Sequence, residues 1–141
     1  EVDKMNRNNQ VISIAYIDLD NFKFVNDKFG HKTGDSLLQI IAGTMKENVR
    51  KTDFVSRLAG DEFAILFPET DLESVKVVIE KVRKKLLDKM QTNNWPVTFS
   101  IGVGVFKKNQ ENLEAMITEV DKLMYEIKNS GKNGIKYKMF E

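Results

Sequence analysis

Two periods of hydrophobic residues alternate along the chain, and they predict strands and helices in turn. Short apolar runs rich in β-branched residues predict strands at 11–17, 97–105 and 135–139, and a hairpin at 54–67. Three-to-four spacing predicts helices after the first strand, over 35–49, after Pro68 and over 113–128. This order predicts an α/β (α+β) sandwich, with helices packed on a central, mostly antiparallel sheet.

The hairpin at 54–67 has the sequence FVSRLAGDEFAILF, and its tip joins Ala59 and Gly60 to the carboxylates of Asp61 and Glu62. A glycine between strand-like runs predicts a tight reversal, because glycine supplies a positive φ without a Cβ clash. Successive side chains of a strand point to opposite faces, so Asp61 and Glu62 are expected to serve different partners, one of them a metal ion. The alternative is an acidic turn that is simply solvated.

A second acidic segment follows the first predicted strand. The run VISIAYI over 11–17 ends in Asp18, Leu19 and Asp20. A strand that ends in an acid, beside a strand pair that turns on an acid, can bring Asp18 and Asp61 within reach of one cation. The two segments together therefore favour a metal site over a solvated turn.

Four segments in this order resemble the GGDEF family of diguanylate cyclase domains: DLDNFKFVNDKFGHKTGD, RLAGDEFAILF, VTFSIGVGVF and VDKLMYEIKNSGKN. They extend over nearly the whole chain, and ordered motifs at compatible spacing are more specific than one five-letter match. The resemblance implies the βαββαβ palm that nucleotidyl cyclases share with polymerases. It also implies an activity, the condensation of two GTP molecules into cyclic di-GMP and pyrophosphate by attack of a 3′-hydroxyl on the α-phosphate.

The same resemblance makes Asp18, the backbone carbonyl of Leu19 and Asp61 the metal ligands, and makes Gly60, Asp61 and Glu62 the catalytic motif. The expected cofactor is Mg²⁺ or Mn²⁺, with two ions in each active half-site. Mg²⁺ usually takes one or two carboxylates together with phosphate oxygens. Such ions polarise the α-phosphate and stabilise the leaving pyrophosphate. Glu62 is either a ligand of the second metal or a group that handles the hydroxyl proton, and the sequence leaves both roles open.

Guanine recognition is placed by the resemblance on Asn26 and Asp35. An Asn side chain offers a donor and an acceptor in one plane, which matches a base edge. Guanine presents N–H donors to the Asp35 carboxylate, whereas the unprotonated N1 of adenine would leave it unpaired, at a cost of about 1 to 3 kcal/mol. The chain is therefore expected to select GTP over ATP. The alternative role of Asp35 is a helix N-cap, since it precedes the predicted helical run over 36–49.

Phosphate binding is expected at the helix that starts near Phe22. Asp20 or Asn21 can cap this helix and leave its first N–H groups free for phosphate oxygens, and Lys23 adds a positive charge nearby. The resemblance adds Phe22 and Lys23 to the substrate-binding residues. In the last predicted helix, Lys122 matches the family lysine that contacts the terminal phosphates.

Two positions depart from the family pattern. Glu126 stands one turn after Lys122, where a basic residue is usual, so triphosphate binding is expected to be weaker or to depend on Lys128. Ala59 stands where the family has glycine, and a left-handed φ there would cost about 1 kcal/mol or more, whereas a negative φ would be harmless. Every acidic position is intact, which favours an active cyclase. The alternative is a degenerate domain that binds GTP or cyclic di-GMP as a regulatory module.

The pair Arg50 and Asp53 forms an RxxD pattern just upstream of the hairpin. Many family members bind their own product, cyclic di-GMP, as an inhibitor at this position. Arg50 would fork onto a phosphate or a guanine edge, and Asp53 would accept from guanine N–H groups. The alternative is structural, because a cation at a helix C-terminus and an acid at the start of a turn are common.

Composition limits the remaining possibilities. A length of 141 residues fits a single GGDEF-like domain over 1–141. With 22 basic and 21 acidic residues, the net charge of +1 argues against bulk binding to nucleic acid or to a membrane surface. Cysteine is absent, and no apolar run approaches the roughly 20 residues of a membrane span. A cytoplasmic domain is expected.

The assembly expected from the resemblance is a homodimer. One domain has one nucleotide site, yet the product joins two nucleotides, so two half-sites must face each other across a two-fold axis. The chain shows no heptad run, so the isolated domain is expected to be mostly monomeric. The family's longer N-terminal helix is represented only by residues 1–7, which indicates a fragment of a larger multidomain protein whose parent could be membrane-anchored. A palm-type polymerase fragment is disfavoured, because the chain has no room for fingers or thumb and no strongly basic groove.

Overall fold

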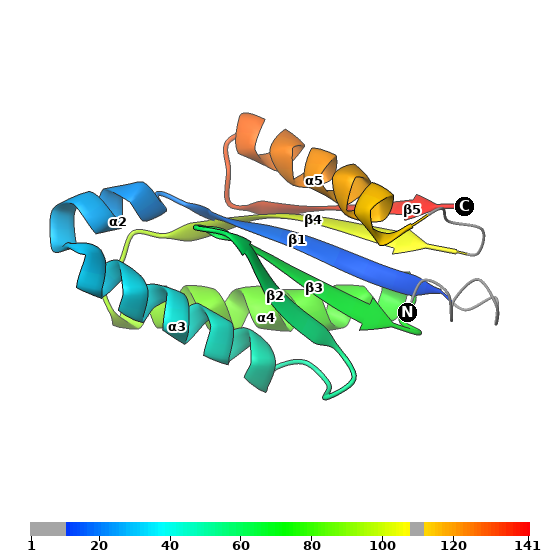
Figure 1. The fold of residues 1–141 in the computed structure, drawn as a ribbon, viewed down its shortest axis with the longest axis horizontal. Coiled ribbons are helices and arrows are strands. Elements are labelled where there is room, and N and C mark those ends of the chain that lie inside the picture. The colour runs from blue at the N-terminus through cyan, green and yellow to red at the C-terminus, as the bar shows by residue number, and fades with distance from the viewer. Residues whose placement is uncertain (1–10, 108–111) are drawn as a thin grey trace.

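The computed structural model describes residues 11–107 and 112–141, and its elements follow the predicted order (Figure 1). The sheet has five strands in the order β2-β3-β1-β4-β5, with β4 and β5 parallel and the other three pairs antiparallel. The predicted fold class is confirmed. The elements are β1 (Ile12–Asp20), α2 (Phe22–Phe29), α3 (His31–Glu47), β2 (Phe54–Ala59), β3 (Glu62–Pro68), α4 (Leu72–Thr92), β4 (Thr98–Phe106), α5 (Leu113–Asn129) and β5 (Gly134–Phe140).

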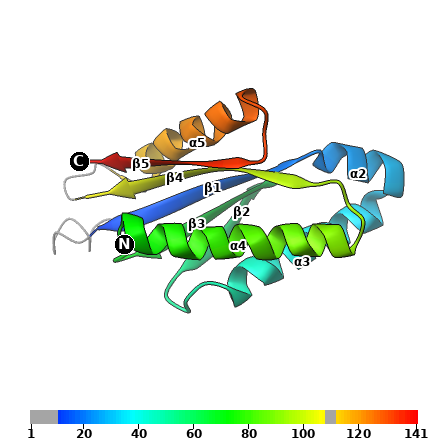
Figure 2. The ribbon, with the colours of Figure 1, turned by 180° about the vertical axis from the view of Figure 1, so that it is seen from behind.

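Helices cover both faces of the sheet: α3 and α4 lie on one face and α5 on the other, while α2 lies beyond the end of β1 (Figures 1 and 2). The central strand β1 sends alternate side chains to two cores. Ile17 and Leu19 are buried in the larger core with α3 and α4, whereas Tyr16 belongs to a smaller core with α5. By the same alternation, the side chains of Asp18 and Asp20 leave β1 on the α5 face.

The close approach of α5 to the sheet depends on Gly102 in β4. A Cβ at this position would lie 2.5 Å from the carbonyl oxygen of Val120 and 2.5 Å from the backbone nitrogen of Met124. Backbone atoms cannot yield as a flexible side chain can, so a larger residue would push α5 away. Gly102 therefore sets the distance at which α5 presents its side chains to the end of β1.

The corner between α2 and α3 differs from the prediction. Gly30, with a φ of 93°, ends α2, and α3 begins immediately at His31 rather than at residue 35. Glycine adopts this angle without a steric penalty, so the second helix needs no longer connection. The other helix starts agree better, since Asp71 caps α4 by accepting from the Ser74 N–H at 2.9 Å.

None of the helices in 11–107 and 112–141 combines the length and the apolar character that a membrane crossing requires. The helical remnant predicted for residues 1–7 lies outside the described residues.

Candidate active site

Strand β1 and the β2–β3 hairpin bring three carboxylates together near the end of β1. Ligand oxygens of Asp18, Asp61 and Glu62 lie within 4.8 Å of one another. Asp18 and Glu62 are direct partners in the antiparallel register of β1 and β3. The Leu19 N–H donates to the carbonyl of Asp61 at 3.0 Å, which ties β1 to the hairpin turn. The structure thus brings Asp18 and Asp61 together, as the sequence predicts.

The expectation that Asp61 and Glu62 serve different partners is wrong for the geometry of the cluster. It assumed that both residues lie in an extended strand, where neighbours point to opposite faces. Asp61 instead belongs to the turn between β2 and β3, and only Glu62 lies in a strand. The turn frees Asp61 from strand alternation, so both carboxylates reach the same cluster.

The hairpin tip also closes differently from the prediction. Neither Ala59 nor Gly60 has a positive φ. The register of β2 and β3 shifts between Arg57 and Ala59, which marks a β-bulge. The Arg57 guanidinium donates to the Ala59 carbonyl at 3.2 Å and to the Gly60 carbonyl at 3.0 Å. Ala59 therefore carries no left-handed strain, and the harmless alternative for this substitution is the one observed.

Asp18 is strongly affected by its surroundings. Its side chain is 13% exposed. Burial raises the pKa of Asp18 to about 6; the Lys128 ammonium opposes this rise, and the charges of Asp61 and Glu62 add to it. The Oδ1 atom of Asp18 is buried and has no hydrogen-bond partner. An unpaired buried carboxylate oxygen is costly, and a cation at the cluster would supply its partner.

Asp20 has a structural role instead. Its Oδ1 accepts from the Ser100 hydroxyl at 2.7 Å and from the Lys128 ammonium at 2.8 Å. Its Oδ2 accepts from the Thr98 hydroxyl at 2.7 Å and from the Asn133 N–H at 3.0 Å. Burial alone would raise the pKa of Asp20, but these hydrogen bonds hold it below its ordinary value. With four donors around its carboxylate, Asp20 is not available as a helix cap or as a metal ligand.

Lys128 extends from α5 to the same end of β1. Its Nζ lies 2.8 Å from Asp20 Oδ1, 3.5 Å from Asp18 Oδ2 and 3.4 Å from the Leu19 carbonyl. Burial would lower the pKa of Lys128, but the two carboxylates raise it, so the ammonium keeps its charge. Lys128 therefore neutralises the buried end of β1. Whether Lys128 also contacts a triphosphate, as expected from Glu126, stays a prediction.

The donor set at the cluster fits a divalent cation. Asp18, Asp61 and Glu62 offer carboxylate oxygens, and hard cations such as Mg²⁺ and Mn²⁺ prefer oxygen ligands. The unpaired Oδ1 of Asp18 is the observation that most directly calls for a cation. These three side chains are the residues that would hold it.

The Asn26 side chain packs against Gly34, the residue before Asp35, at the α2–α3 corner. A Cβ at Gly34 would overlap the Oδ1 atom of Asn26, so the Asn26 side chain lies directly on the α3 backbone beside Asp35. The N-cap alternative for Asp35 is wrong, because α3 starts at His31 and Asp35 lies in its second turn. Asp35 is exposed. Its carboxylate faces outward on α3, where a ligand can reach it.

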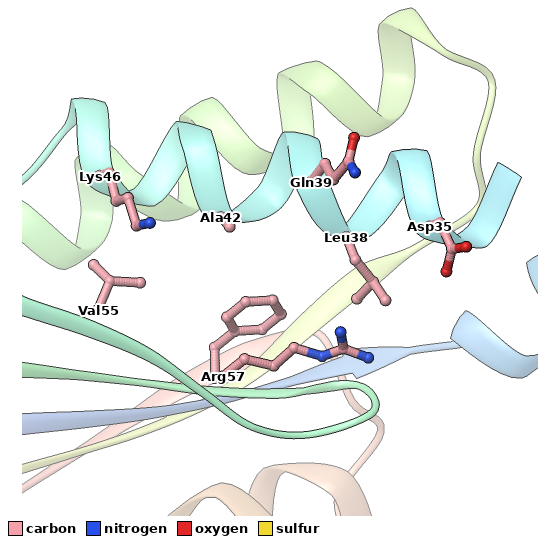
Figure 3. A pocket seen from close by; sticks show the side chains of 8 residues that line it. Asp35, Leu38, Gln39, Ala42, Lys46, Val55 and Arg57 are labelled. Carbon is pink, nitrogen blue, oxygen red and sulfur yellow. The ribbon is translucent and has the colours of Figure 1, made fainter. Parts of the chain in front are cut away.

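A cleft of about 350 Å³ lies between α3 and the hairpin. Figure 3 shows Asp35 and Leu38 of α3 together with Arg57 of β2 toward one end, and Lys46 and Val55 at the other. The cleft thus begins at one of the two residues predicted to recognise guanine. Its apolar side chains offer a surface for the face of a planar base.

No side chain caps α2. Asn21 occupies the cap position with a φ of 68° and makes no capping hydrogen bond, and its Nδ2 donates to the Pro96 carbonyl instead. The predicted cap by Asp20 or Asn21 is therefore wrong. The first N–H groups of α2, at Phe22 and Lys23, keep the orientation that suits an anion. The Lys23 side chain is 91% exposed.

The α5 surface carries the remaining candidate for phosphate contact. Lys122 is 67% exposed and pairs with Glu119 at 3.2 Å. Glu126 pairs with Lys136 of β5 at 2.6 Å. The charge of Glu126 is thus balanced by a cation, which reduces the repulsion of phosphate expected from the sequence.

Arg50 and Asp53 contact each other in the connection between α3 and β2. Arg50 Nη2 donates to Asp53 Oδ1 at 3.0 Å, to the Pro68 carbonyl at 2.8 Å and to Thr70 Oγ1 at 2.7 Å. The Asp53 side chain is 1% exposed and also accepts from the Arg50 N–H at 2.8 Å. The pair closes this turn, as the structural alternative predicted. Hollows of about 350 and 330 Å³ are each lined by both residues.

Sequence reasoning missed two residues at the cluster. The Tyr16 hydroxyl donates to Glu62 Oε1 at 2.9 Å. The pKa of Asp121 in α5 is raised by burial and by the charge of Glu62, which places a fourth carboxylate near the cluster. The strand period of two could have identified Tyr16, since it stands two residues before Asp18 and shares its face. No local pattern marks Asp121, because its position depends on how α5 packs.

The fold and the site together define a class: a palm-like, mostly antiparallel sheet whose central strand ends at a carboxylate cluster suited to a divalent cation. The family model described as diguanylate cyclase, GGDEF domain, matches residues 1–134. The chain therefore belongs to the GGDEF domain family of diguanylate cyclases.

Individual relatives agree with this assignment. The chain is 37% identical to the biofilm architecture maintenance protein MbaA of Vibrio cholerae, over 91% of this chain and 18% of that protein. It is 33% identical to diguanylate cyclase DgcP of Pseudomonas aeruginosa, over 94% of this chain and 20% of that protein. The chain thus spans about a fifth of the length of these relatives. The crystal structure of diguanylate cyclase SiaD from Pseudomonas aeruginosa, in complex with its activator SiaC, matches with a TM-score of 0.87 at 30% identity, over 98% of this chain and 54% of that one.

Proposed function

We propose that this chain is a diguanylate cyclase domain that condenses two GTP molecules into cyclic di-GMP and pyrophosphate. The observation that carries the proposal is the convergence of Asp18, Asp61 and Glu62 within 4.8 Å. The α2–α3 corner with Asn26 and Asp35 follows β1 directly, so the candidate base site and the cluster lie at the same end of the sheet (Figure 1). Family membership supports the same reaction.

In this proposal, the nucleotide enters with its base at the α2–α3 corner. Asn26 and Asp35 pair with the guanine edge, and Leu38 lines the adjoining cleft. Asp35 then selects GTP over ATP, because adenine offers it no N1–H donor. The triphosphate follows the uncapped N-terminus of α2 at Phe22 and Lys23, where backbone N–H groups attract oxygen anions.

The carboxylates act on the α-phosphate end of the substrate. Asp18, Asp61 and Glu62 would hold the expected two Mg²⁺ or Mn²⁺ ions together with the Leu19 carbonyl, and Lys122 would contact the terminal phosphates. Bound ions polarise the α-phosphate and stabilise the pyrophosphate leaving group. Gly60 leaves open space at the hairpin tip, since a Cβ there would meet no atom within 4 Å. The backbone can therefore approach a phosphate closely.

Catalysis in this proposal needs two copies of the domain. Each copy holds one GTP, and the attacking 3′-hydroxyl comes from the GTP of the partner across a two-fold axis. The isolated domain is therefore expected to be slow, and a device that brings two copies together should activate it.

The experiment that tests the function is a cyclase assay on a forced dimer. The chain is fused to a constitutive dimerisation segment, supplied with GTP and Mg²⁺, and compared with the same fusion carrying Asp61→Ala. The proposal predicts cyclic di-GMP from the parent fusion and a loss of at least about a hundredfold in the variant. Product no higher than in the variant, with GTP still bound, would show the regulatory binding module instead.

We also propose that Arg50 and Asp53 belong to an inhibitory site for cyclic di-GMP, because each lines both neighbouring hollows. Arg50 is 55% exposed, so its guanidinium can donate to a ligand while the Asp53 carboxylate stays buried. Arg50→Lys keeps the charge that neutralises Asp53 but removes the planar fork. The variant should bind cyclic di-GMP at least about tenfold more weakly, as measured by calorimetry; thermal unfolding measures the separate loss of stability expected because Lys cannot reproduce the Arg50 bonds to Asp53, Pro68 and Thr70. Unchanged affinity would remove the inhibitory site.

A further inference from the structure

Tyr16 is the polar member of an otherwise apolar cluster between β1 and α5. Its side chain is 7% exposed, and it packs with Ile14, Val120 and Met124. Phenylalanine would fill the same apolar space, so packing does not explain the hydroxyl. A buried hydroxyl needs a partner, and here the partner is Oε1 of Glu62, at 2.9 Å.

The register of β1 and β3 places the Tyr16 side chain next to Glu62. Asp18 faces Glu62 across the β1–β3 pair, and Tyr16 stands two residues earlier on the same face of β1, so Tyr16 is a diagonal neighbour of Glu62. The ordinary pKa of a tyrosine phenol is about 10, so the hydroxyl that donates to Glu62 carries its proton near neutral pH. The donor is therefore present throughout the pH range in which the domain would work.

The Glu62 carboxylate needs such a restraint. Asp18 and Asp61 lie within 4.8 Å of it, Asp121 is also close enough to interact with its charge, and like charges at these separations repel. A glutamate side chain has three rotatable bonds and could turn away into solvent. A hydrogen bond from a rigid, buried phenol opposes that movement.

We propose that Tyr16 is a positioning residue that holds the Glu62 carboxylate in place for a divalent cation. The hydrogen bond occupies Oε1 and fixes the plane of the carboxylate, which leaves Oε2 as the oxygen for the cation. The proposal rests on the proposed function, because it assumes that the cluster of Asp18, Asp61 and Glu62 binds a metal. It assigns to Tyr16 no contact with the nucleotide.

The test measures Mn²⁺ alone, without nucleotide, by electron paramagnetic resonance titration of the 141-residue chain. Tyr16→Phe removes only the hydroxyl and keeps the apolar packing. Loss of a partner that orients a metal ligand typically weakens metal binding by about 10- to 100-fold, and about tenfold is expected here. The matched control is Tyr125→Phe on the exposed surface of α5, where the side chain is 60% exposed; its Mn²⁺ affinity should equal that of the parent.

A double-mutant cycle with Glu62→Ala shows whether Tyr16 acts through Glu62. Once Glu62 is truncated, Tyr16→Phe should cause no further loss of Mn²⁺ affinity. In the dimerised enzyme, Tyr16→Phe should raise the Mn²⁺ concentration needed for half-maximal rate and leave the KM for GTP unchanged at saturating metal.

Different results would contradict the positioning role of Tyr16 and the proposed cyclase function. If Glu62→Ala weakens Mn²⁺ binding but Tyr16→Phe does not, the positioning role is overturned and the proposed function stands. An equal loss from Tyr16→Phe with and without the Glu62 carboxylate would also overturn it. If the unaltered chain binds no Mn²⁺ in the absence of nucleotide, the positioning proposal falls, and the proposed function is then decided by the cyclase assay on the forced dimer, where phosphate oxygens complete the metal site.

Discussion

At the scale of single residues, the hairpin tip shows whether glycine is required there by the fold or by a bound ligand. Ala59 lies in β2 without a positive φ, so its methyl group causes no backbone strain. Gly60 also lacks a positive φ, and a methyl group added there would meet no atom within 4 Å. The fold therefore tolerates a side chain at both positions, and any requirement for glycine must come from a bound nucleotide.

This distinction gives a pair of predictions. Ala59→Gly should lower the free energy of unfolding by about 0.5 to 1 kcal/mol, because glycine in a strand loses more entropy on folding. Gly60→Ala should leave it unchanged within about 0.5 kcal/mol but weaken GTP binding by about tenfold, because the added methyl occupies the space that a phosphate would use. Denaturant unfolding and GTP titration measure both. A Gly60→Ala variant that unfolds would show that the fold itself requires this glycine.

Asp18 predicts two pH dependences of opposite sign. Its folded-state pKa is raised to about 6 from 3.8, so protonated Asp18 stabilises the metal-free fold. That contribution is complete below pH 3.8 and is lost as the pH rises through about 6. A cation needs the carboxylate instead, so Mn²⁺ affinity should rise with pH through the same range and then level off.

Asp18→Asn tests both effects together. At about pH 7.5 the variant should unfold with a free energy about 1 to 2 kcal/mol higher in the absence of metal, because it removes a buried charge repelled by its neighbours. It should also lose Mn²⁺ binding. A less stable variant, or one that binds Mn²⁺ as the parent does, would contradict the assignment of Asp18.

The residue scale also shows what the sequence could predict. Asp18 and Asp61 were predictable because each follows or joins apolar strand segments, and ordered motifs fixed their place in a known family. The N-cap role of Asp20 failed because its donors, Thr98, Ser100 and Asn133, are distant in sequence and meet it only in the folded sheet. Interactions of this kind leave no local pattern.

At the scale of elements, the position of α5 links the core to the site. Gly102 lets the backbone of α5 contact β4, and α5 carries Lys128, which neutralises the buried end of β1. A shift of the helix would therefore change packing and electrostatics together. The sequence GVG in the fourth strand could be predicted as a strand, but its glycines could not be explained until the helix above them was known.

This dependence can be measured with two glycine substitutions. Gly102→Ala should lower the free energy of unfolding by about 1 to 3 kcal/mol, because its Cβ would meet the backbone of α5, and it should also weaken Mn²⁺ binding. Gly43→Ala is the matched control in α3, where a Cβ meets nothing within 4 Å, and it should stabilise the domain by about 0.5 to 1 kcal/mol. Equal effects of the two substitutions would contradict the close contact between α5 and β4.

The α2–α3 corner illustrates an element boundary that sequence pattern did not predict. The spacing of apolar residues predicts a helix over 35–49 and a loop before residue 35. Gly30 adopts a positive φ and lets α3 start at His31, which moves Asp35 from a cap into the helix. Gly34 then leaves room for the Asn26 side chain beside the residue that precedes Asp35, and this packing left no pattern in the sequence.

At the scale of the whole molecule, the candidate site occupies one end of the sheet. The central strand β1 carries Asp18, which meets the hairpin tip on one side and Lys128 of α5 on the other. Helix α2 continues from the end of β1 toward the cleft beneath α3 (Figures 1 and 3). The order of elements was predictable, because strands and helices alternate with clear periods. The convergence of three carboxylates, with Tyr16, Asp20 and Lys128 supporting them, required the assembled sheet.

The most direct test of the account is the position of Mn²⁺ in crystals of the chain grown with a non-hydrolysable GTP analogue, located by anomalous scattering. We expect an anomalous peak coordinated by Asp18 and Asp61, with the guanine held by Asn26 and Asp35. A peak elsewhere, or a nucleotide bound away from the carboxylate cluster, would contradict it.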